Sequence, residues 1–143
     1  MIRPLLIGLA ALILAGQLHA QTVCEMRGAE VLPELEEAKT LFLASEFREF
    51  ADYMRNSMGD GAETLYEPLD RLASLVPQGF DSCQVVLQRK DVGGLIQEVS
   101  TFNVRGLTFP VSLYLAAIPV RDRWIIARVN FNTTFGSVLE SVK

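Results

Sequence analysis

Two stretches in the second half of the chain decide the predicted fold: residues 107–115 read LTFPVSLYL and residues 125–131 read IIARVNF. Apolar side chains occupy alternate positions in both, which is the period of a β-strand with one buried face. The two apolar sets are Leu107, Phe109, Val111, Leu113 and Leu115, and Ile125, Ala127, Val129 and Phe131. Both sets face one core only if an odd-numbered loop joins the strands, because a shift of one residue turns a whole set outward. A loop of residues 120–122 predicts that Leu115 pairs with Ala127, Leu113 with Val129, Val111 with Phe131, Tyr114 with Arg128 and Ile118 with Trp124.

The chain before these strands changes from a helical to a strand period near Gly79. Apolar residues at helical spacing predict helices over about 30–44, 46–58 and 65–75, with Ser45 as the N-cap of the second. After Gly79, alternation predicts a first strand around Val85 and Leu87 and a second from Leu95 to Phe102. Helices followed by an antiparallel meander predict an α+β fold, with one layer of helices on one face of a twisted sheet.

The first twenty residues have the composition of an export signal. Arg3 precedes an apolar run from Leu5 to Ala15, and the following segment ends in the small residue Ala20. The run is too short to span a bilayer, and no later segment approaches the ~20 apolar residues that a membrane-spanning helix needs. We therefore expect residues 1–20 to be a signal peptide and residues 21–143 to form a single exported domain, periplasmic or secreted, without stable membrane insertion.

Composition excludes several kinds of function. The only histidine, His19, is expected to leave with the signal, so the mature domain lacks an imidazole for general-base catalysis or zinc binding. The formal net charge is −4 and the basic residues are scattered, so no nucleic-acid partner is expected. The acidic residues of the helices are interpreted as solvated faces, and Gly59-Asp60-Gly61 only faintly resembles a calcium loop. No metal and no cofactor are expected.

Cys24 and Cys83 are the only cysteines in the chain. In an oxidising compartment they are predicted to form a disulfide. Closing a loop of about 60 residues would stabilise the fold by roughly 4 kcal/mol in the chain-entropy model. The alternative is a lipid anchor on Cys24, but Gln21-Thr22-Val23 lacks the small residue that normally precedes a lipidated bacterial cysteine.

Three motifs carry a resemblance to a known family. They are residues 41–50 (LFLASEFREF), residues 77–80 (PQGF), and residues 122–126 (DRWII) followed by Val129-Asn130-Phe131. Together they resemble the nuclear-transport-factor-2-like superfamily, and small exported members of unknown function are the nearest match. The resemblance implies a cystatin-like cone, in which a curved sheet wraps a helix and leaves a pocket or an association surface at the open end. Homodimerisation through the sheet is common in that superfamily, and Trp124 and Ile118 would suit such a contact.

The candidate ligand-binding residues are assigned to the even-numbered face of the predicted sheet. They are Glu98, Ser112, Tyr114, Trp124, Arg128 and Asn130. Aromatic surface mixed with hydrogen-bonding groups is typical of small-ligand pockets, and Arg128 could hold a carboxylate or phosphate in a bidentate contact. An alternating polar face is equally typical of a solvated sheet. The sequence leaves pocket, interface and solvent face open.

The predicted function is non-catalytic: binding of a small apolar or amphipathic ligand, or of a protein partner, through the sheet or cone. No catalytic residue is assigned. The alternative is a histidine-free acid–base enzyme of the isomerase or dehydratase type, using a carboxylate and a tyrosine. Asp52 beside Tyr53 invites that comparison, although Asp52 is interpreted as a solvated helix residue. A buried acid within hydrogen-bond reach of a tyrosine in a closed pocket would favour the enzyme; a cone filled by Phe and Leu would not.

Overall fold

The computed structural model describes residues 22–143, so the predicted signal peptide and its cleavage site lie outside the described residues. The elements, in chain order, are α1 (Pro33–Leu43), α2 (Phe47–Met58), the 3-10 helix η1 (Gly59–Leu65), α3 (Tyr66–Leu75), β1 (Phe80–Lys90), β2 (Ile96–Val104), β3 (Pro110–Val120), β4 (Arg123–Asn132) and α4 (Phe135–Leu139). Across this described part, no helix has the length and apolarity to cross a membrane.

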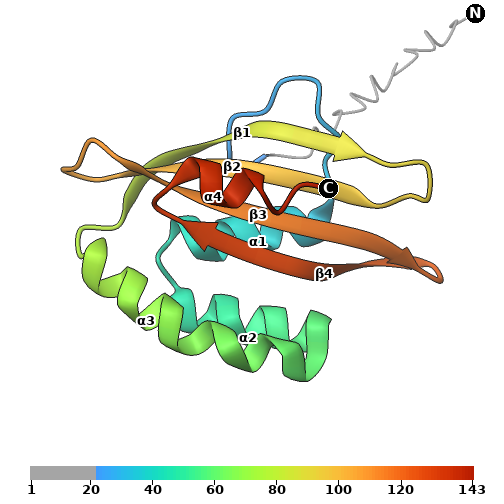
Figure 1. Cartoon of the computed structure of the whole chain (residues 1–143), viewed down its shortest axis with the longest axis horizontal. Coiled ribbons are helices and arrows are strands. Elements are labelled where there is room, and N and C mark those ends of the chain that lie inside the picture. The colour runs from blue at the N-terminus through green and yellow to red at the C-terminus, as the bar shows by residue number, and fades with distance from the viewer. Residues whose placement is uncertain (1–21) are drawn as a thin grey trace, which may run out of the picture.

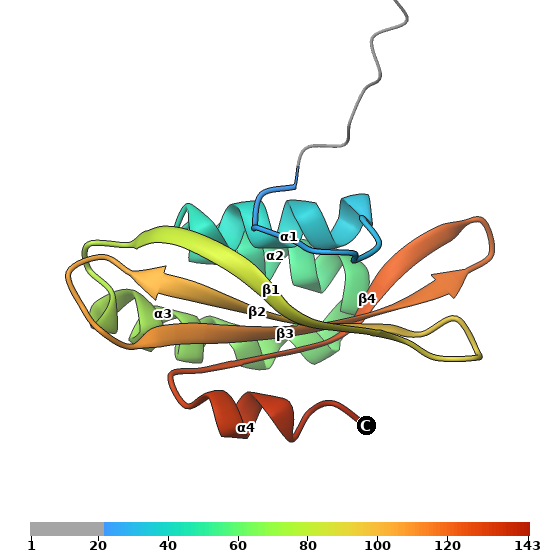
Figure 2. The same ribbon diagram turned by 90° about the horizontal axis from the view of Figure 1, so that it is seen from above.

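The four strands form one antiparallel sheet in the order β1-β2-β3-β4 (Figure 1). Helices α1, α2 and α3 pack against one face of this sheet, which we call the helix face. The short helix α4 lies on the opposite side, the outer face (Figure 2). The α+β fold with an N-terminal helical layer is therefore confirmed. The sequence did not predict α4.

The turn between α1 and α2 differs from the prediction. Ser45 is not an N-cap: it adopts a left-handed conformation with φ of 57°, and Glu46 precedes α2 without a side-chain cap. The backbone N–H of Ser45 donates to the carbonyl of Phe42 at 3.0 Å. The backbone N–H of Glu46 donates to the carbonyl of Leu41, also at 3.0 Å. These two bonds satisfy the last carbonyls of α1 in a Schellman arrangement. Ser45 therefore ends the first helix rather than starting the second.

The predicted register of the β3–β4 hairpin is wrong. The loop contains two residues, Arg121 and Asp122, because Val120 pairs directly with Arg123. A bulge at Ala127 then adds one residue to β4, and this restores the facing that an odd-numbered loop would have given. The resulting pairs are Leu115 with Val129, Leu113 with Phe131, Tyr114 with Asn130, Ala116 with Arg128, Ile118 with Ile125 and Pro119 with Trp124.

The apolar alternation predicted the buried side of β3 but not its beginning. Val111, Leu113 and Leu115 are buried on the helix face, as expected. Leu107 and Phe109 precede the strand, which starts at Pro110, and they are 47% and 38% exposed. Because Pro110 has no N–H to donate, it suits the first position of a strand.

The core on the helix face is organised around the ring of Phe42. Its centroid lies 4.8–6.0 Å from five other phenylalanine rings, mostly in edge-to-face or tilted arrangements. These rings are Phe47, Phe50, Phe80, Phe102 and Phe131. Aromatic pairs of this kind contribute about 0.5–1.5 kcal/mol each beyond the burial of their area. Phenylalanine side chains therefore fill the interior around Phe42.

Residues 22–32 form a segment, the strap, that runs beside β1. The predicted disulfide between Cys24 and Cys83 is present and ties the strap to β1. Next to it, Glu25 N donates to the Cys83 carbonyl at 3.0 Å and Val85 N donates to the Glu25 carbonyl at 2.8 Å. The strap thus pairs with the exposed edge of β1 over one short parallel bridge.

A buried charge cluster lies between α1 and the sheet. The ammonium of Lys39 is fully buried, 2.6 Å from Glu36 and 2.7 Å from Glu98 on β2. Gln88 donates to Glu98 at 2.9 Å, and its side-chain amide also exchanges two hydrogen bonds with the backbone of Glu30. At the other end of the strap, Val23 N donates to the Glu36 carboxylate at 2.9 Å. The cluster therefore holds both ends of the strap.

Candidate functional site

The structure divides the predicted ligand-binding residues between the two faces of the sheet. Ser112, Tyr114, Arg128 and Asn130 share the outer face, but Glu98 and Trp124 belong to the helix face. Glu98 pairs with Leu115, so even positions of β2 lie beside odd positions of β3. For Trp124 the bulge at Ala127 reverses the alternation. The single even-numbered face assumed from the sequence is therefore wrong.

Helix α4 and the C-terminal residues cover much of the outer face. Tyr114 is 2% exposed and donates to Gln97 Oε1 at 2.9 Å, and Asn130 donates to Ser141 Oγ at 2.9 Å. Val99, Ala116 and Val138 pack around Tyr114 in a small second core. Arg128 is exposed at the margin. The tyrosine and asparagine thus use their polar groups in structural contacts.

Trp124 lines a cleft on the helix-face side, between the β3–β4 hairpin and the first two helices. The cleft has a volume of about 260 Å³ and is lined by Glu34, Tyr53, Asn56, Ser57, Val120, Arg123, Trp124 and Ile125. Trp124 also packs from its half-buried position against the main core. Aromatic surface with convergent polar groups in a concave site is the usual composition of a small-ligand site. This cleft is the candidate site.

Helix α2 presents one face to the cleft. Tyr53, Asn56 and Ser57 are three and four residues apart, so they lie on the same side of the helix. The Ser57 hydroxyl accepts from Ile126 N at 2.7 Å and donates to the Ile126 carbonyl at 3.1 Å. It therefore binds both backbone groups of a residue on edge strand β4, next to the bulge. Ser57 fixes the wall of the cleft.

Tyr53 connects the two helices beside the cleft. Its hydroxyl donates to the backbone carbonyl of Glu34 at 3.1 Å. Burial, and after it the carboxylates of Glu34 and Glu37, raise the pKa of Tyr53 above its ordinary value. The phenol is therefore protonated near neutral pH and keeps its proton in a structural hydrogen bond.

The two charged residues of the cleft have no partner for their charge. Glu34 Oε2 is buried without a hydrogen bond, and across residues 22–143 neither Glu34 nor Arg123 forms an ion pair. Glu34 is in the first turn of α1, whereas Arg123 opens β4. Sequence reasoning missed both, because these elements are far apart in the chain. Of the residues that line the cleft, Trp124 was the one predicted to bind a ligand, and the helical spacing of Tyr53, Asn56 and Ser57 is the further signal that the sequence contains.

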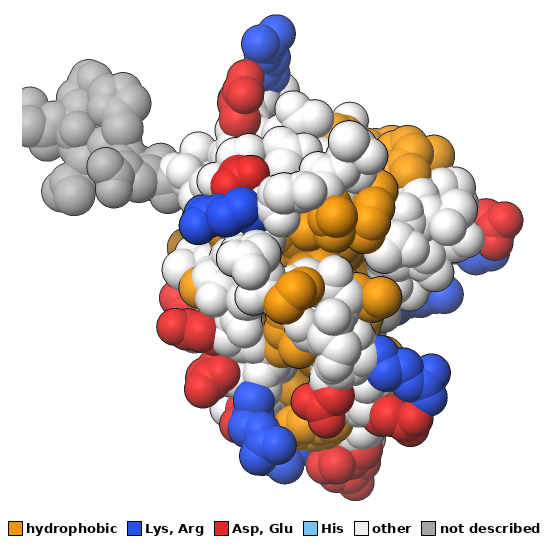
Figure 3. Space-filling model, turned by 90° about the vertical axis from the view of Figure 1, so that its left-hand side faces the viewer, with side chains coloured by type: hydrophobic (Ala, Val, Ile, Leu, Met, Phe, Trp, Pro, Cys, Tyr) orange, Lys and Arg blue, Asp and Glu red, His pale blue; other side chains and the backbone are white. Residues whose placement is uncertain are grey.

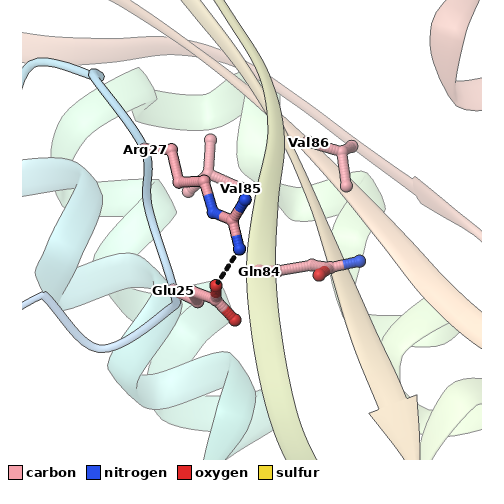
Figure 4. Close-up of a pocket in the computed structure, with 5 residues that line it drawn as sticks. All are labelled: Glu25, Arg27, Gln84, Val85 and Val86. Carbon is pink, nitrogen blue, oxygen red and sulfur yellow. Dashed lines mark hydrogen bonds and ion pairs between the residues drawn. The ribbon is translucent and has the colours of Figure 1, made fainter.

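A second depression lies between the strap and β1 (Figure 4). It measures about 390 Å³ and is lined by Glu25, Arg27, Gln84, Val85 and Val86. Glu25 and Arg27 face each other there at 3.4 Å, and both side chains are largely exposed. The groove is larger than the cleft at Trp124, but it has no aromatic wall and its two charges satisfy one another. It is the weaker candidate for a ligand.

Apolar side chains gather in a band at one end of the molecule (Figure 3). The exposed large apolar residues there are Leu75, Leu107, Phe109 and Phe135. A groove of about 180 Å³ lies at the same end between α3 and the end of β4, lined partly by Leu72 and Phe131. Its only charged residue, Arg71, pairs with Glu67. This end offers apolar area without a free charge to orient a ligand.

The acid–tyrosine pair of the structure forms in an open setting, between other residues than those considered for the enzyme alternative. Asp52 accepts a hydrogen bond from Tyr66, not from its neighbour Tyr53, and Arg55 lies near both. The Asp52 side chain is 48% exposed, and neither Asp52 nor Tyr66 lines the cleft at Trp124. Within residues 22–143, no group of three or more His, Cys, Asp or Glu side chains is placed to hold a metal ion.

Comparisons with known proteins do not assign the chain to a family. No protein-family model, no curated protein and no solved structure matches it. The nuclear-transport-factor-2-like superfamily therefore stays a prediction from the three motifs.

Proposed function

We propose that this chain is an exported, non-catalytic binding domain that takes a small amphipathic ligand, or one side chain of a protein partner, into the cleft at Trp124. In this proposal the sheet and helices form a nuclear-transport-factor-2-like cone with its open end at the cleft. One observation carries the proposal. The indole of Trp124 and the phenol of Tyr53 line a cleft with two unpaired charges, whereas phenylalanine fills the interior around Phe42.

The acid–base alternative has less support. In the cleft, the Tyr53 hydroxyl donates to a backbone carbonyl rather than to a carboxylate. Asp52 and Tyr66 do form a carboxylate–phenol pair, but they do so at the surface, where water would solvate both groups. An acid that must hold its proton near neutral pH needs an apolar site that raises its pKa. The contacts favour binding over proton transfer.

Fluorescence titration with 8-anilinonaphthalene-1-sulfonate tests this function. Trp124 is the only tryptophan, so energy transfer from it to the bound dye reports on the cleft. Asn56→Phe would fill the mouth of the cleft without changing charge and should weaken dye binding about tenfold or more, about 1.4 kcal/mol. Gln78→Phe, an exposed position outside the cleft, should leave binding unchanged. Equal affinity in the two variants would place the dye elsewhere and refute the proposal.

A further inference from the structure

The charges around the cleft identify the class of ligand that fits it. Resting on the proposed function, we infer that the cleft selects molecules carrying both a cationic and an anionic group on an apolar body. Amino acids and aminoalkyl carboxylates belong to this class. The cationic group would lie beside Glu34, the anionic group beside Arg123, and the apolar body between Tyr53 and Trp124.

Opposite charges share the cleft without neutralising each other. Other carboxylates and cations of the described chain do form ion pairs with one another, among them Glu25 with Arg27, Glu67 with Arg71, and Asp81 with Arg105. Glu34 and Arg123 line one cleft and form no ion pair. Because both side chains line the same cleft, a ligand with complementary ends would pair with both. A singly charged ligand would satisfy only one.

The Glu34 side chain lacks a hydrogen-bond partner in the described chain for one of its oxygens. This oxygen, Oε2, is buried, and a buried polar atom left without a partner costs free energy. The nearby rings would also attract a cation through their π faces. The Tyr53 hydroxyl cannot relieve Glu34, because it donates to the backbone carbonyl of the same residue. A bound ammonium would supply the missing charge.

Three matched probes separate this inference from the proposed function. 4-(Aminomethyl)benzoate carries both charges, whereas benzylamine keeps only the cation and 4-methylbenzoate only the anion. Because the chain has one tryptophan, a single indole N–H signal in a nitrogen–proton correlation spectrum reports on binding at the cleft. We expect 4-(aminomethyl)benzoate to bind about tenfold more tightly than either singly charged probe, as one further charge-assisted contact allows.

Two substitutions assign the ends of the ligand. Glu34→Gln should weaken 4-(aminomethyl)benzoate and benzylamine but not 4-methylbenzoate, and Arg123→Gln should weaken the two carboxylates but not benzylamine. Glu37→Gln and Arg121→Gln make the same charge changes on neighbouring residues outside the cleft and serve as controls. The inference fails if all three probes bind equally or if the controls match the test variants. It also fails if none shifts the indole signal while Asn56→Phe still blocks the dye, a result that leaves the proposed function intact.

Discussion

The helix face and the outer face of the sheet are covered very differently. Three helices cover the helix face, where six phenylalanine rings, five of them buried, and a cluster of three charged side chains are packed. The outer face has one five-residue helix, α4, over a small core around Tyr114. The area of the cover therefore decides how much each face contributes to stability. Beyond the rings, the helix face also has the cleft lined by Tyr53 and Trp124.

The largest loss of stability is expected at the centre of the helix face. Phe42→Ala removes a ring with no exposed surface and leaves a cavity among five others, so the free energy of unfolding should fall by about 3–5 kcal/mol. Phe109→Ala is the matched control, because that ring is 38% exposed and precedes β3. It should cost well under half as much. Urea denaturation measures both, and equal losses would contradict the assignment of the core to Phe42.

The charge cluster on the same face gives the second prediction. Lys39→Met leaves Glu36 and Glu98 facing each other without their cation, so we expect a loss of about 3–5 kcal/mol. Because the cluster also binds Val23 and Glu30, the strap should become sensitive to proteases before the rest of the domain.

A second substitution controls for simple loss of packing. Adding Glu98→Leu to Lys39→Met removes one of the two unpaired carboxylates and should restore about half or more of the lost stability. Thermal unfolding of the two variants side by side decides the point. If Lys39→Met alone leaves the melting temperature unchanged, the ion pairs contribute nothing to stability, and the disulfide and the hydrogen bonds to β1 hold the strap without them.

The sequence predicted which side chains of β3 are buried, but it did not predict which residues of neighbouring strands share a face. Alternation in β3 identified Leu113 and Leu115 as buried, because apolar residues at a period of two leave little choice of face. The relation between strands depends on register, and the bulge at Ala127 and the pairing of Glu98 with Leu115 leave no local signal. Glu98 was placed with the polar residues because one alternation of even and odd positions was assumed for all strands, whereas Glu98 pairs with Leu115 and contacts Lys39 on α1. The five residues of α4 are too few to show a helical period.

The residues of the candidate cleft also differ in how far the sequence predicts them. Trp124 was predicted as a ligand-binding residue from its place on the even-numbered face, and Tyr53 was considered for a different role. Glu34 and Arg123 join them only through the packing of α1 beside the β3–β4 hairpin. The predicted pairs of Ile118 with Trp124 and Tyr114 with Arg128 would have placed the site on the outer face. The observed register, and not a difference in composition, places the candidate site on the helix-face side instead.

The smallest effect is expected on the outer face, where Tyr114→Phe removes one hydrogen bond to Gln97. Lys143 N still donates to the same oxygen, so the loss near neutral pH should be about 1 kcal/mol. Burial raises the pKa of Tyr114, and the smaller opposing effect of Arg128 does not cancel it. Above pH 10 the unfolded chain therefore releases the Tyr114 proton before the folded chain does, and stability falls as pH rises toward the folded-state pKa. The Tyr114→Phe variant lacks this loss of stability at high pH. Its disadvantage in urea denaturation should shrink between pH 8 and about pH 11, and parallel pH profiles for the two proteins would show that Tyr114 titrates as it does in water.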